Sequence, residues 1–548
     1  MIKDGVVVDE PAAAPQAAGR STLVNSAVAD VMSTCLMQIE CSFTRGFAGM
    51  QLIGNTTEVC RDGKERARAA LEGLGIHIPP RRLVVSLTPA DVKKDGNHFD
   101  LPLAVSLALL LKDQPRTVAP ERWLFAAELG LGGELRPVRA VVSFAVAAMA
   151  GGLEGLVIAP GNLEEVRVLA DLSPTGARPL VAHSFSTLRD VLAWIFDGQT
   201  PAVVRAGRSP QRRHLPPAEV NFDDMILPPS LELAALTVGA GMHSLLLRGS
   251  PGTGKSMLAA RLASIIPNLP HEEHIEAMRI YSSGAERLPD ALLAGRPPYR
   301  APHHQASAVA VMGSPDTAGE LALAHGGVLF LDELPEFRRD LLEALREPLE
   351  SGEIRVARAH RKVIWKSRVV FVAACNNCAC GWAGSARQPC TCSSARLHAY
   401  RQRLSGPILE RIDLHVNVPE PDSANAELLL RLAHHDGSSL TKRLMARVQA
   451  ARTFALRRNV PLGALLNRDL PACQLLAASG LSGVDFAALV NRRLSKSASS
   501  RSVIRCVRVA RTLADLSESP VIREEHLDQA WLWQAERAAQ ARGECFVS

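Results

Sequence analysis

A glycine-rich motif in the middle of the chain constrains the fold more than any other feature. It reads G-S-P-G-T-G-K-S and lies between an apolar run at 244–248 and a helical pattern at 257–266. In the order strand, glycine loop, helix, backbone N–H groups close around phosphate oxygens, and the helix N-terminus adds partial positive charge. The motif therefore predicts an α/β fold with a phosphate-binding loop, and the alternative is a chance match in a tight turn. The loop consists of Gly249, Ser250, Pro251, Gly252, Thr253, Gly254, Lys255 and Ser256.

Two further apolar runs end in polar residues that suit the same chemistry. Residues 328–331 precede Asp332 and Glu333, and residues 369–374 precede Asn376. We expect Lys255 to reach the β- and γ-phosphates of ATP, and Ser256 and Asp332 to hold Mg²⁺. Glu333 would polarise the attacking water, which Asn376 could position. An exposed acidic turn is the alternative for the acidic pair, although four apolar residues precede it.

The length of 548 residues suggests three or four domains at about 100–200 residues each. No run reaches 18 apolar residues, and the N-terminus has no signal-peptide pattern, so we expect a cytoplasmic protein that does not enter a membrane. Composition and periodicity predict a flexible extension at 1–20, a mixed domain at 21–198, a linker at 199–221, an ATPase domain at 222–421 and a helical lid at 422–548.

Four of the 11 cysteines fall within a short loop-like segment. Four thiolates are enough for a tetrahedral structural zinc site, although the C-x-C spacing is less common than C-x₂-C. Free thiols or a disulfide are the alternatives, and the cytosol disfavours the disulfide. His304 and His398 could substitute as ligands. The four cysteines are Cys378, Cys380, Cys390 and Cys392.

A basic segment at 353–365 resembles two strands around a turn. The net charge of +6 is compatible with a nucleic-acid partner, whereas only 4% of the residues are aromatic, which disfavours base stacking as the main binding mode. The segment is either a DNA-binding hairpin or an ordinary solvated face. Its candidate DNA contacts are Arg355, Arg358, Arg361, Lys362 and Lys366, with Arg300 in a second element.

Several ordered motifs resemble the magnesium-chelatase-like AAA+ ATPases. They are RAPHH at 300–304, GELALAHGGVLFLDEL at 319–334, LREPLESGE at 345–353, SGPILERID at 405–413 and VARTLADL at 509–516. Within that family, four N-terminal motifs are similar to the ComM/YifB type, and the resemblance covers roughly residues 30–545. These are KERARAAL at 64–71, LTPAD at 87–91, FDLPLA at 99–104 and GELRPV at 133–138.

The resemblance implies a hexameric AAA+ ATPase that acts as a DNA helicase. Such proteins promote branch migration on single-stranded or branched DNA during natural transformation, alongside recombination proteins. Arg411 would be the arginine finger reaching a neighbouring subunit, Arg501 the sensor arginine on the lid, with Arg505 as its alternative, and Asn376 sensor 1. The chain departs from the family at sensor 1, where Cys375-Asn376-Asn377 replaces Met-Asn-Pro.

The N-terminal domain resembles the Lon-protease fold, an α+β domain, but lacks the catalytic pair. Lys94-Asp95-Gly96 is followed by no serine before Asp100, and residues 138–142 contain no lysine. A nucleophile needs an activating base, so we expect no peptidase activity. Three rivals to the DNA motor are a chelatase-type motor, an ATP-dependent protease and a regulatory ATPase that remodels a protein partner.

Overall fold

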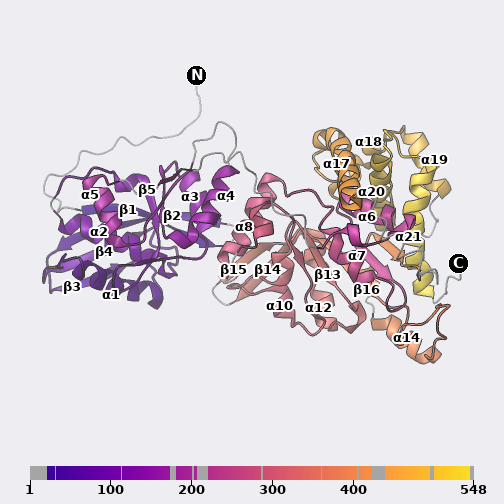
Figure 1. Ribbon diagram of the computed structural model, residues 1–548, viewed down its shortest axis with the longest axis horizontal. Coiled ribbons are helices and arrows are strands. Elements are labelled where there is room, and N and C mark those ends of the chain that lie inside the picture. Colours follow the sequence, from indigo (N-terminus) through magenta and orange to yellow (C-terminus); the bar gives the residue numbers. More distant parts are fainter. Residues whose placement is uncertain are drawn as a thin grey trace, which may run out of the picture. The chain divides into compact units, whose positions relative to one another are not determined.

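The computed structural model divides the chain into two compact units, residues 1–209 and 210–548. It describes residues 21–30, 33–112, 114–172, 180–199, 203–205, 220–284, 288–358, 361–403, 406–420, 439–493 and 499–542. The expected extension at 1–20 and most of the expected linker at 199–221 lie outside these ranges. Figure 1 shows the elements of both units.

An eight-stranded mixed sheet organises the N-terminal unit, in the order β10-β9-β8-β5-β1-β2-β4-β3. Its long strands alternate buried and exposed residues, as expected for a sheet with one covered face. A small ribbon of β6 (Glu128–Leu129) and β7 (Leu135–Arg136) lies outside the sheet. The sheet strands are β1 (Ser21–Asp30), β2 (Ser33–Thr44), β3 (Gly49–Ile53), β4 (Arg82–Thr88), β5 (Trp123–Ala126), β8 (Gly155–Ile158), β9 (Val181–Ser184) and β10 (Val203–Arg205).

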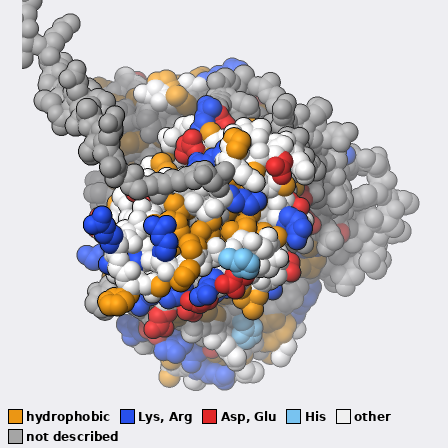
Figure 2. All heavy atoms as spheres, turned by 90° about the vertical axis from the view of Figure 1, so that its left-hand side faces the viewer, with side chains coloured by type: hydrophobic (Ala, Val, Ile, Leu, Met, Phe, Trp, Pro, Cys, Tyr) orange, Lys and Arg blue, Asp and Glu red, His pale blue; other side chains and the backbone are white. Residues whose placement is uncertain are grey.

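Five helices accompany this sheet in the described part of the unit. Helix α2 is buried along nearly its whole length, which explains its uniformly apolar sequence. Figure 2 shows a face of the unit where hydrophobic side chains gather, with lysine and arginine side chains around them. The helices are α1 (Glu58–Glu72), α2 (Asp100–Leu111), α3 (Val141–Ala150), α4 (Leu163–Asp171) and α5 (Leu188–Asp197).

The second unit is built on a five-stranded parallel sheet in the order β12-β13-β16-β11-β17. Its central strands are continuous apolar runs because both faces are covered. Since all strands run the same way, their carboxyl ends share one edge. The strands are β11 (Leu245–Arg248), β12 (Tyr299–Arg300), β13 (Val328–Leu331), β16 (Val370–Cys375) and β17 (Leu414–Asn417).

Helices and one hairpin surround this sheet. The hairpin pairs β14 (Glu353–Arg358) with β15 (Arg361–Lys366) in antiparallel register. The helices are α6 (Pro229–Gly241), α7 (Lys255–Leu262), α8 (His271–Ser283), α9 (Asp290–Leu293), α10 (Ala308–Met312), α11 (Glu320–Leu323), α12 (Arg339–Ala344), α13 (Arg346–Ser351), α14 (Ser394–Arg403) and α15 (Gly406–Leu409).

The C-terminal region is helical and shares one hydrophobic core with the parallel sheet. Val448 of α17 and Leu513 of α20 belong to the same buried cluster as Leu245 and Val370 of the strands. The Thr441 hydroxyl also accepts a hydrogen bond from the Phe222 amide at 2.9 Å. The helices are α17 (Leu440–Asn459), α18 (Leu475–Ser479), α19 (Gly483–Arg493), α20 (Ser500–Leu516) and α21 (Glu524–Arg542).

One strand lies within the predicted linker. Val203–Arg205 form β10, which pairs with Val181–Ser184 in antiparallel register at the edge of the first sheet. Two consecutive valines favour an extended backbone, and the free edge of β9 offers hydrogen-bonding partners. The folded part of the N-terminal unit therefore reaches beyond residue 198.

Candidate active site

The glycine-rich loop connects β11 to α7 at the carboxyl edge of the parallel sheet. Gly252 and Gly254 have φ values of +76° and +86°, a left-handed backbone that favours glycine. Helix α7 begins at Lys255, so the first-turn amides face an incoming anion. The local sequence thus folds into a strand, a glycine loop and a helix in the order that the motif predicts.

Lys255 is buried within this loop. Its ammonium donates hydrogen bonds to the carbonyl oxygens of Gly249 at 2.9 Å and Ser250 at 2.8 Å. Burial lowers the pKa of Lys255 from its ordinary value. The charge is therefore held inside the loop by backbone oxygens, which places it where phosphate oxygens would compete for it.

Ser256 and the acidic pair meet although they are far apart in the chain. The Ser256 hydroxyl donates to the Asp332 carboxylate at 2.6 Å. Asp332 also accepts a hydrogen bond from the Glu333 amide at 2.9 Å. A hydroxyl and a carboxylate are oxygen ligands that Mg²⁺ accepts, so these residues fit the ion that ATP chemistry requires.

Glu333 has an unusual backbone. Its φ of +52° is left-handed, which costs a non-glycine residue of order 1–3 kcal/mol and often marks a functional position. Its carboxylate is about half exposed and lies 3.3 Å from His304 Nδ1. The sequence did not indicate this contact, because His304 was considered as a substitute zinc ligand.

Asn376 follows β16, and the sheet order places that strand between β11 and β13. The three strands therefore bring the glycine loop, the acidic pair and Asn376 to one edge. The Asn376 carbonyl accepts a hydrogen bond from Tyr400 of α14 at 3.3 Å.

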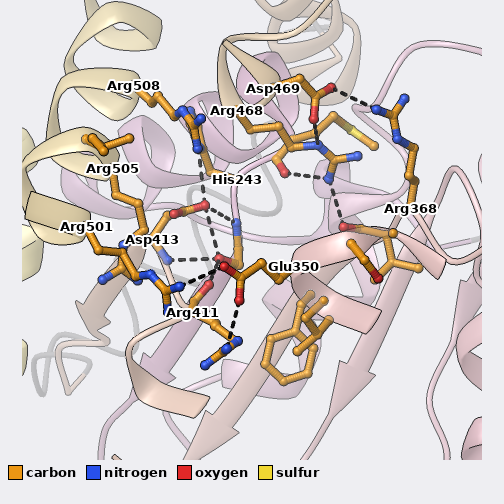
Figure 3. A pocket seen from close by; sticks show the side chains of 18 of the residues that line it. His243, Glu350, Arg368, Arg411, Asp413, Arg468, Asp469, Arg501, Arg505 and Arg508 are labelled. Carbon is orange, nitrogen blue, oxygen red and sulfur yellow. Dashed lines mark hydrogen bonds and ion pairs between the residues drawn. The ribbon is translucent and has the colours of Figure 1, made fainter. Parts of the chain in front are cut away.

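Arg411 and Arg501 meet at the opposite edge of the sheet. They line a cavity of about 440 Å³ together with His243, Val369 and Asp413, which precede β11, β16 and β17. Figure 3 shows this cavity. Amino ends and carboxyl ends of parallel strands lie on opposite edges, so neither arginine faces its own chain's glycine loop.

Glu350 joins the two arginines. Arg411 and Arg501 each donate to this carboxylate at 2.8 Å, through different oxygens (Figure 3). Arg411 also donates to the Arg346 carbonyl at 2.8 Å. The sequence does not predict this contact. Glu350, Arg411 and Arg501 lie in separate segments of the chain and meet only in the folded structure. The other arginines that line the cavity are Arg368, Arg468, Arg505 and Arg508.

Asp413 balances part of this positive charge. Burial by itself would raise the pKa of Asp413, but the hydrogen bond and charge of His243, with Arg505, lower it to about 2. His243 Nδ1 lies 3.4 Å from the Asp413 carboxylate. Asp413 is therefore ionised at neutral pH.

The four predicted zinc ligands lie together. The sulfur atoms of Cys378, Cys380, Cys390 and Cys392 are all within 4.8 Å of one another. Cys378 is buried and the other three are half-buried, and all four are free thiols. This donor set fits a tetrahedral Zn²⁺ ion.

The basic hairpin presents two of its predicted DNA contacts to solvent. Arg355 and Lys362 are exposed, whereas Ile354 and Trp365 of the opposite face are buried. Lys366 forms an ion pair with Glu353 at 2.9 Å. The side chains of Arg358 and Arg361 lie outside the described residues.

Arg300 is engaged elsewhere. Its guanidinium makes a two-point ion pair with Glu320, at 2.6 and 2.9 Å. A DNA phosphate would have to compete with this pair.

In the described part of the chain, no single helix is long and apolar enough to cross a membrane. The pair Ala472–Ser479 and Gly483–Arg492 reaches that length and composition only when taken together, across a bend of 101°.

Three family models match the chain. "Subunit ChlI of Mg-chelatase" matches residues 39–162, "Magnesium chelatase, subunit ChlI" residues 226–426, and "Magnesium chelatase, subunit ChlI C-terminal" residues 438–533. The central model is a ChlI-type AAA+ ATPase domain, which implies ATP binding with Mg²⁺ and ATP hydrolysis.

Similar proteins extend over nearly the whole chain. "Uncharacterized protein YifB" of Escherichia coli K12 is 33% identical over 508 residues, covering 91% of this chain and 94% of the relative. "Competence protein ComM" of Haemophilus influenzae is 33% identical over 506 residues, covering 91% and 94%. The family models and these relatives agree, and the chain belongs to the YifB/ComM family of Mg-chelatase ChlI-like proteins.

Proposed function

We propose that this chain is an ATP-driven DNA motor that works as a cytoplasmic homo-hexamer. It would act on single-stranded or branched DNA and drive branch migration, with recombination proteins, when incoming DNA is integrated in natural transformation. One similar protein carries the name "Competence protein ComM".

The proposal rests on the distance between the ATP-binding residues and the two arginines, which lie at opposite edges of the parallel sheet. The glycine loop, Asp332 and Glu333 lie at the carboxyl edge, whereas Arg411 and Arg501 lie at the amino edge. Arginine stabilises the charge that develops on a transferred phosphoryl group only when it touches that group. Each complete site therefore needs the arginines of a second copy, as in a closed ring.

The basic hairpin supports DNA as the substrate of the motor. Arg355 and Lys362 lie on its solvent face and could contact phosphates without sequence preference. Such contacts suit a motor that moves along DNA, because it must bind every sequence equally.

We further propose that the N-terminal unit is a Lon-like domain without peptidase activity. Ser143, the hydroxyl nearest the expected lysine position, is fully buried in α3. Lys94 is also fully buried, and its ammonium donates to the Pro89 carbonyl. Neither side chain is open to a peptide substrate, so we expect this unit to bind DNA or shape the ring.

A second candidate is a chelatase-type or regulatory AAA+ ATPase that remodels a protein partner. The match of residues 226–426 to the magnesium chelatase model favours it, because such a motor would use the same ATP site. The two functions differ in the substrate that the ring handles.

A strand-displacement and branch-migration assay tests the proposal. The purified protein should resolve a labelled four-way junction into two duplexes when ATP and Mg²⁺ are present, and the Arg355→Ala/Lys362→Ala variant should do so more slowly. Binding without any ATP-dependent movement of the junction would favour the protein-remodelling function.

A further inference from the structure

The spacing of the four cysteine sulfurs matches a bound metal. The sulfur–sulfur distances are 3.3 Å for Cys378–Cys380, 3.7 Å for Cys378–Cys390 and 3.6 Å for Cys380–Cys390. Four thiolates at about 2.3 Å from a tetrahedral zinc ion lie about 3.8 Å apart. A disulfide requires about 2.05 Å, which is far shorter.

A backbone amide also contacts one of these sulfurs. The Ala383 amide donates to Cys378 Sγ at 3.3 Å. Hydrogen bonds of this kind orient the ligands of a metal and balance their negative charge. In the described part of the chain, no other group of three or more such ligands gathers in this way.

The cysteine segment lies directly on the phosphate-binding loop. Gly381 directly follows Cys380 and has a φ of +91°. A Cβ atom at this position would lie 2.5 Å from Pro251 Cγ and 2.7 Å from Pro251 Cδ. Only glycine allows so close an approach. The backbone beside Cys380 thus forms one wall against which Pro251 packs.

The Glu420 side chain also contacts the cysteine segment. Its carboxylate accepts a hydrogen bond from the Ala386 amide at 3.3 Å. Hydrogen bonds from the side chains of Ser250 and Ser385 lower the pKa of Glu420. The carboxylate therefore holds the cysteine segment through Ala386 and lies close to Ser250 of the phosphate-binding loop.

The segment also begins at the catalytic edge of the sheet. Asn376 lies two positions before Cys378, and the Asn377 side chain donates to the Ala383 carbonyl at 3.0 Å. A rigid cysteine segment would hold Asn376 in place as well as Pro251.

We propose that Cys378, Cys380, Cys390 and Cys392 bind one zinc ion, and that this ion braces the phosphate-binding loop through the contact with Pro251. Zinc occupancy then raises the affinity of the chain for ATP. This inference rests on ATP binding at residues 249–256 and needs no DNA, so its failure is distinct from that of the proposed motor.

Metal analysis and nucleotide binding test the proposal together. The purified full-length protein should carry one zinc per chain, with no iron and no labile sulfide. Removal of zinc by a zinc-selective chelator that spares Mg²⁺ should weaken binding of a fluorescent non-hydrolysable ATP analogue by about 5- to 150-fold, the usual range of coupling between two sites. Restored zinc should restore the affinity.

Reciprocity provides a check that irreversible misfolding cannot imitate. Coupling between two ligands is symmetric at equilibrium, so the ATP analogue must raise the zinc affinity by the same factor. Competition with a zinc indicator at equilibrium, with and without the analogue, measures this factor. The proposal would be overturned if the ATP analogue left the zinc affinity unchanged, or changed it by a different factor from the one by which zinc changes the ATP affinity.

Two variants separate the metal from its effect. Gly381→Ala leaves all four ligands in place but forces the segment away from Pro251, so it should keep one zinc and still bind ATP more weakly. Cys378→Ser/Cys380→Ser should lose both zinc and affinity. Cys473→Ser, an exposed cysteine outside the cluster, is the matched control. Protein without zinc, an iron–sulfur cluster, or full ATP affinity in metal-free protein would each overturn the proposal.

Discussion

Arg411 and Arg501 donate to different oxygens of one carboxylate, that of Glu350, each at 2.8 Å. The pair lies at the amino edge of the parallel sheet, away from the glycine loop of the same chain. The guanidinium groups of the two arginines are thus held together at a position that ATP bound to a neighbouring chain could reach. The ATP site is therefore expected to be shared between chains.

Complementation between inactive variants follows from this arrangement. Lys255→Ala removes the loop charge, and Arg411→Ala should lower kcat by about 10³–10⁵-fold, as expected for an arginine finger. Each variant alone is inactive, but a mixture contains interfaces that combine an intact loop with an intact Arg411. We expect ATP hydrolysis to return when the two are mixed and allowed to exchange subunits.

The matched control is a mixture of Lys255→Ala with Glu333→Gln. Both changes affect the same side of the interface, so no combination restores a complete site, and this mixture should stay inactive. If the first mixture were as inactive as the second after proven subunit exchange, Arg411 would not act on the neighbouring chain.

Glu333 should separate ATP binding from hydrolysis. Glu333→Gln keeps the size and the backbone position but cannot accept a proton, so kcat should fall by about 10²–10⁴-fold while nucleotide affinity is nearly unchanged. His304→Asn, which removes the contact at 3.3 Å, should also change kcat rather than affinity. If Glu333→Gln lost its affinity for ATP as well as its hydrolysis, Glu333 would have a structural role instead.

His98 predicts an acid-sensitive N-terminal unit. This side chain is buried and contacts the Ala27 carbonyl at 2.9 Å, and burial lowers its pKa from 6.5 to about 4. Below pH 6.5 the unfolded chain binds a proton that the folded chain refuses, so stability falls until the pH reaches about 4. The loss should be on the order of 2–3 kcal/mol by pH 4.5.

Urea unfolding of the N-terminal unit at pH 7.5 and 4.5 measures this effect. His98→Gln should remove that part of the pH dependence, and His77→Gln, at an exposed position, is the control. If His98→Gln and the wild type lost the same amount of stability between pH 7.5 and 4.5, groups other than His98 would cause the loss.

The basic hairpin predicts a change in salt dependence. Arg355→Ala/Lys362→Ala should reduce the slope of log affinity against log salt by about 0.9 for each lost duplex phosphate contact, or about 0.7 on single strands. Arg338→Ala/Arg403→Ala removes two exposed arginines of the same unit that are paired with Asp340 and Glu336. If both variants changed the slope equally, net charge and not the hairpin would explain DNA binding.

The motif strands could be predicted because they are apolar on both faces. The runs at 244–248, 328–331 and 369–374 correspond to β11, β13 and β16. A parallel sheet covered on both sides leaves such runs uninterrupted, so their pattern is visible in the sequence.

Contacts between distant segments could not be predicted in the same way. The order of the strands, the shared Glu350 carboxylate and the packing of Gly381 on Pro251 depend on tertiary structure alone. The family motifs identified Arg411 and Arg501, but only the fold shows that both lie away from their own chain's loop. Strand β10 could not be predicted within a linker rich in proline and basic residues, because three residues are too few for a periodic signal.

ATP hydrolysis by the purified protein without DNA, with single-stranded DNA and with forked DNA tests the DNA motor most directly. Lys255→Ala serves as the control, because loss of the buried ammonium should abolish hydrolysis under all three conditions. For a DNA motor we expect strong stimulation by DNA that disappears in Lys255→Ala. Hydrolysis that depends on Lys255 but is indifferent to every DNA tested would contradict the DNA motor and favour an ATPase that remodels a protein.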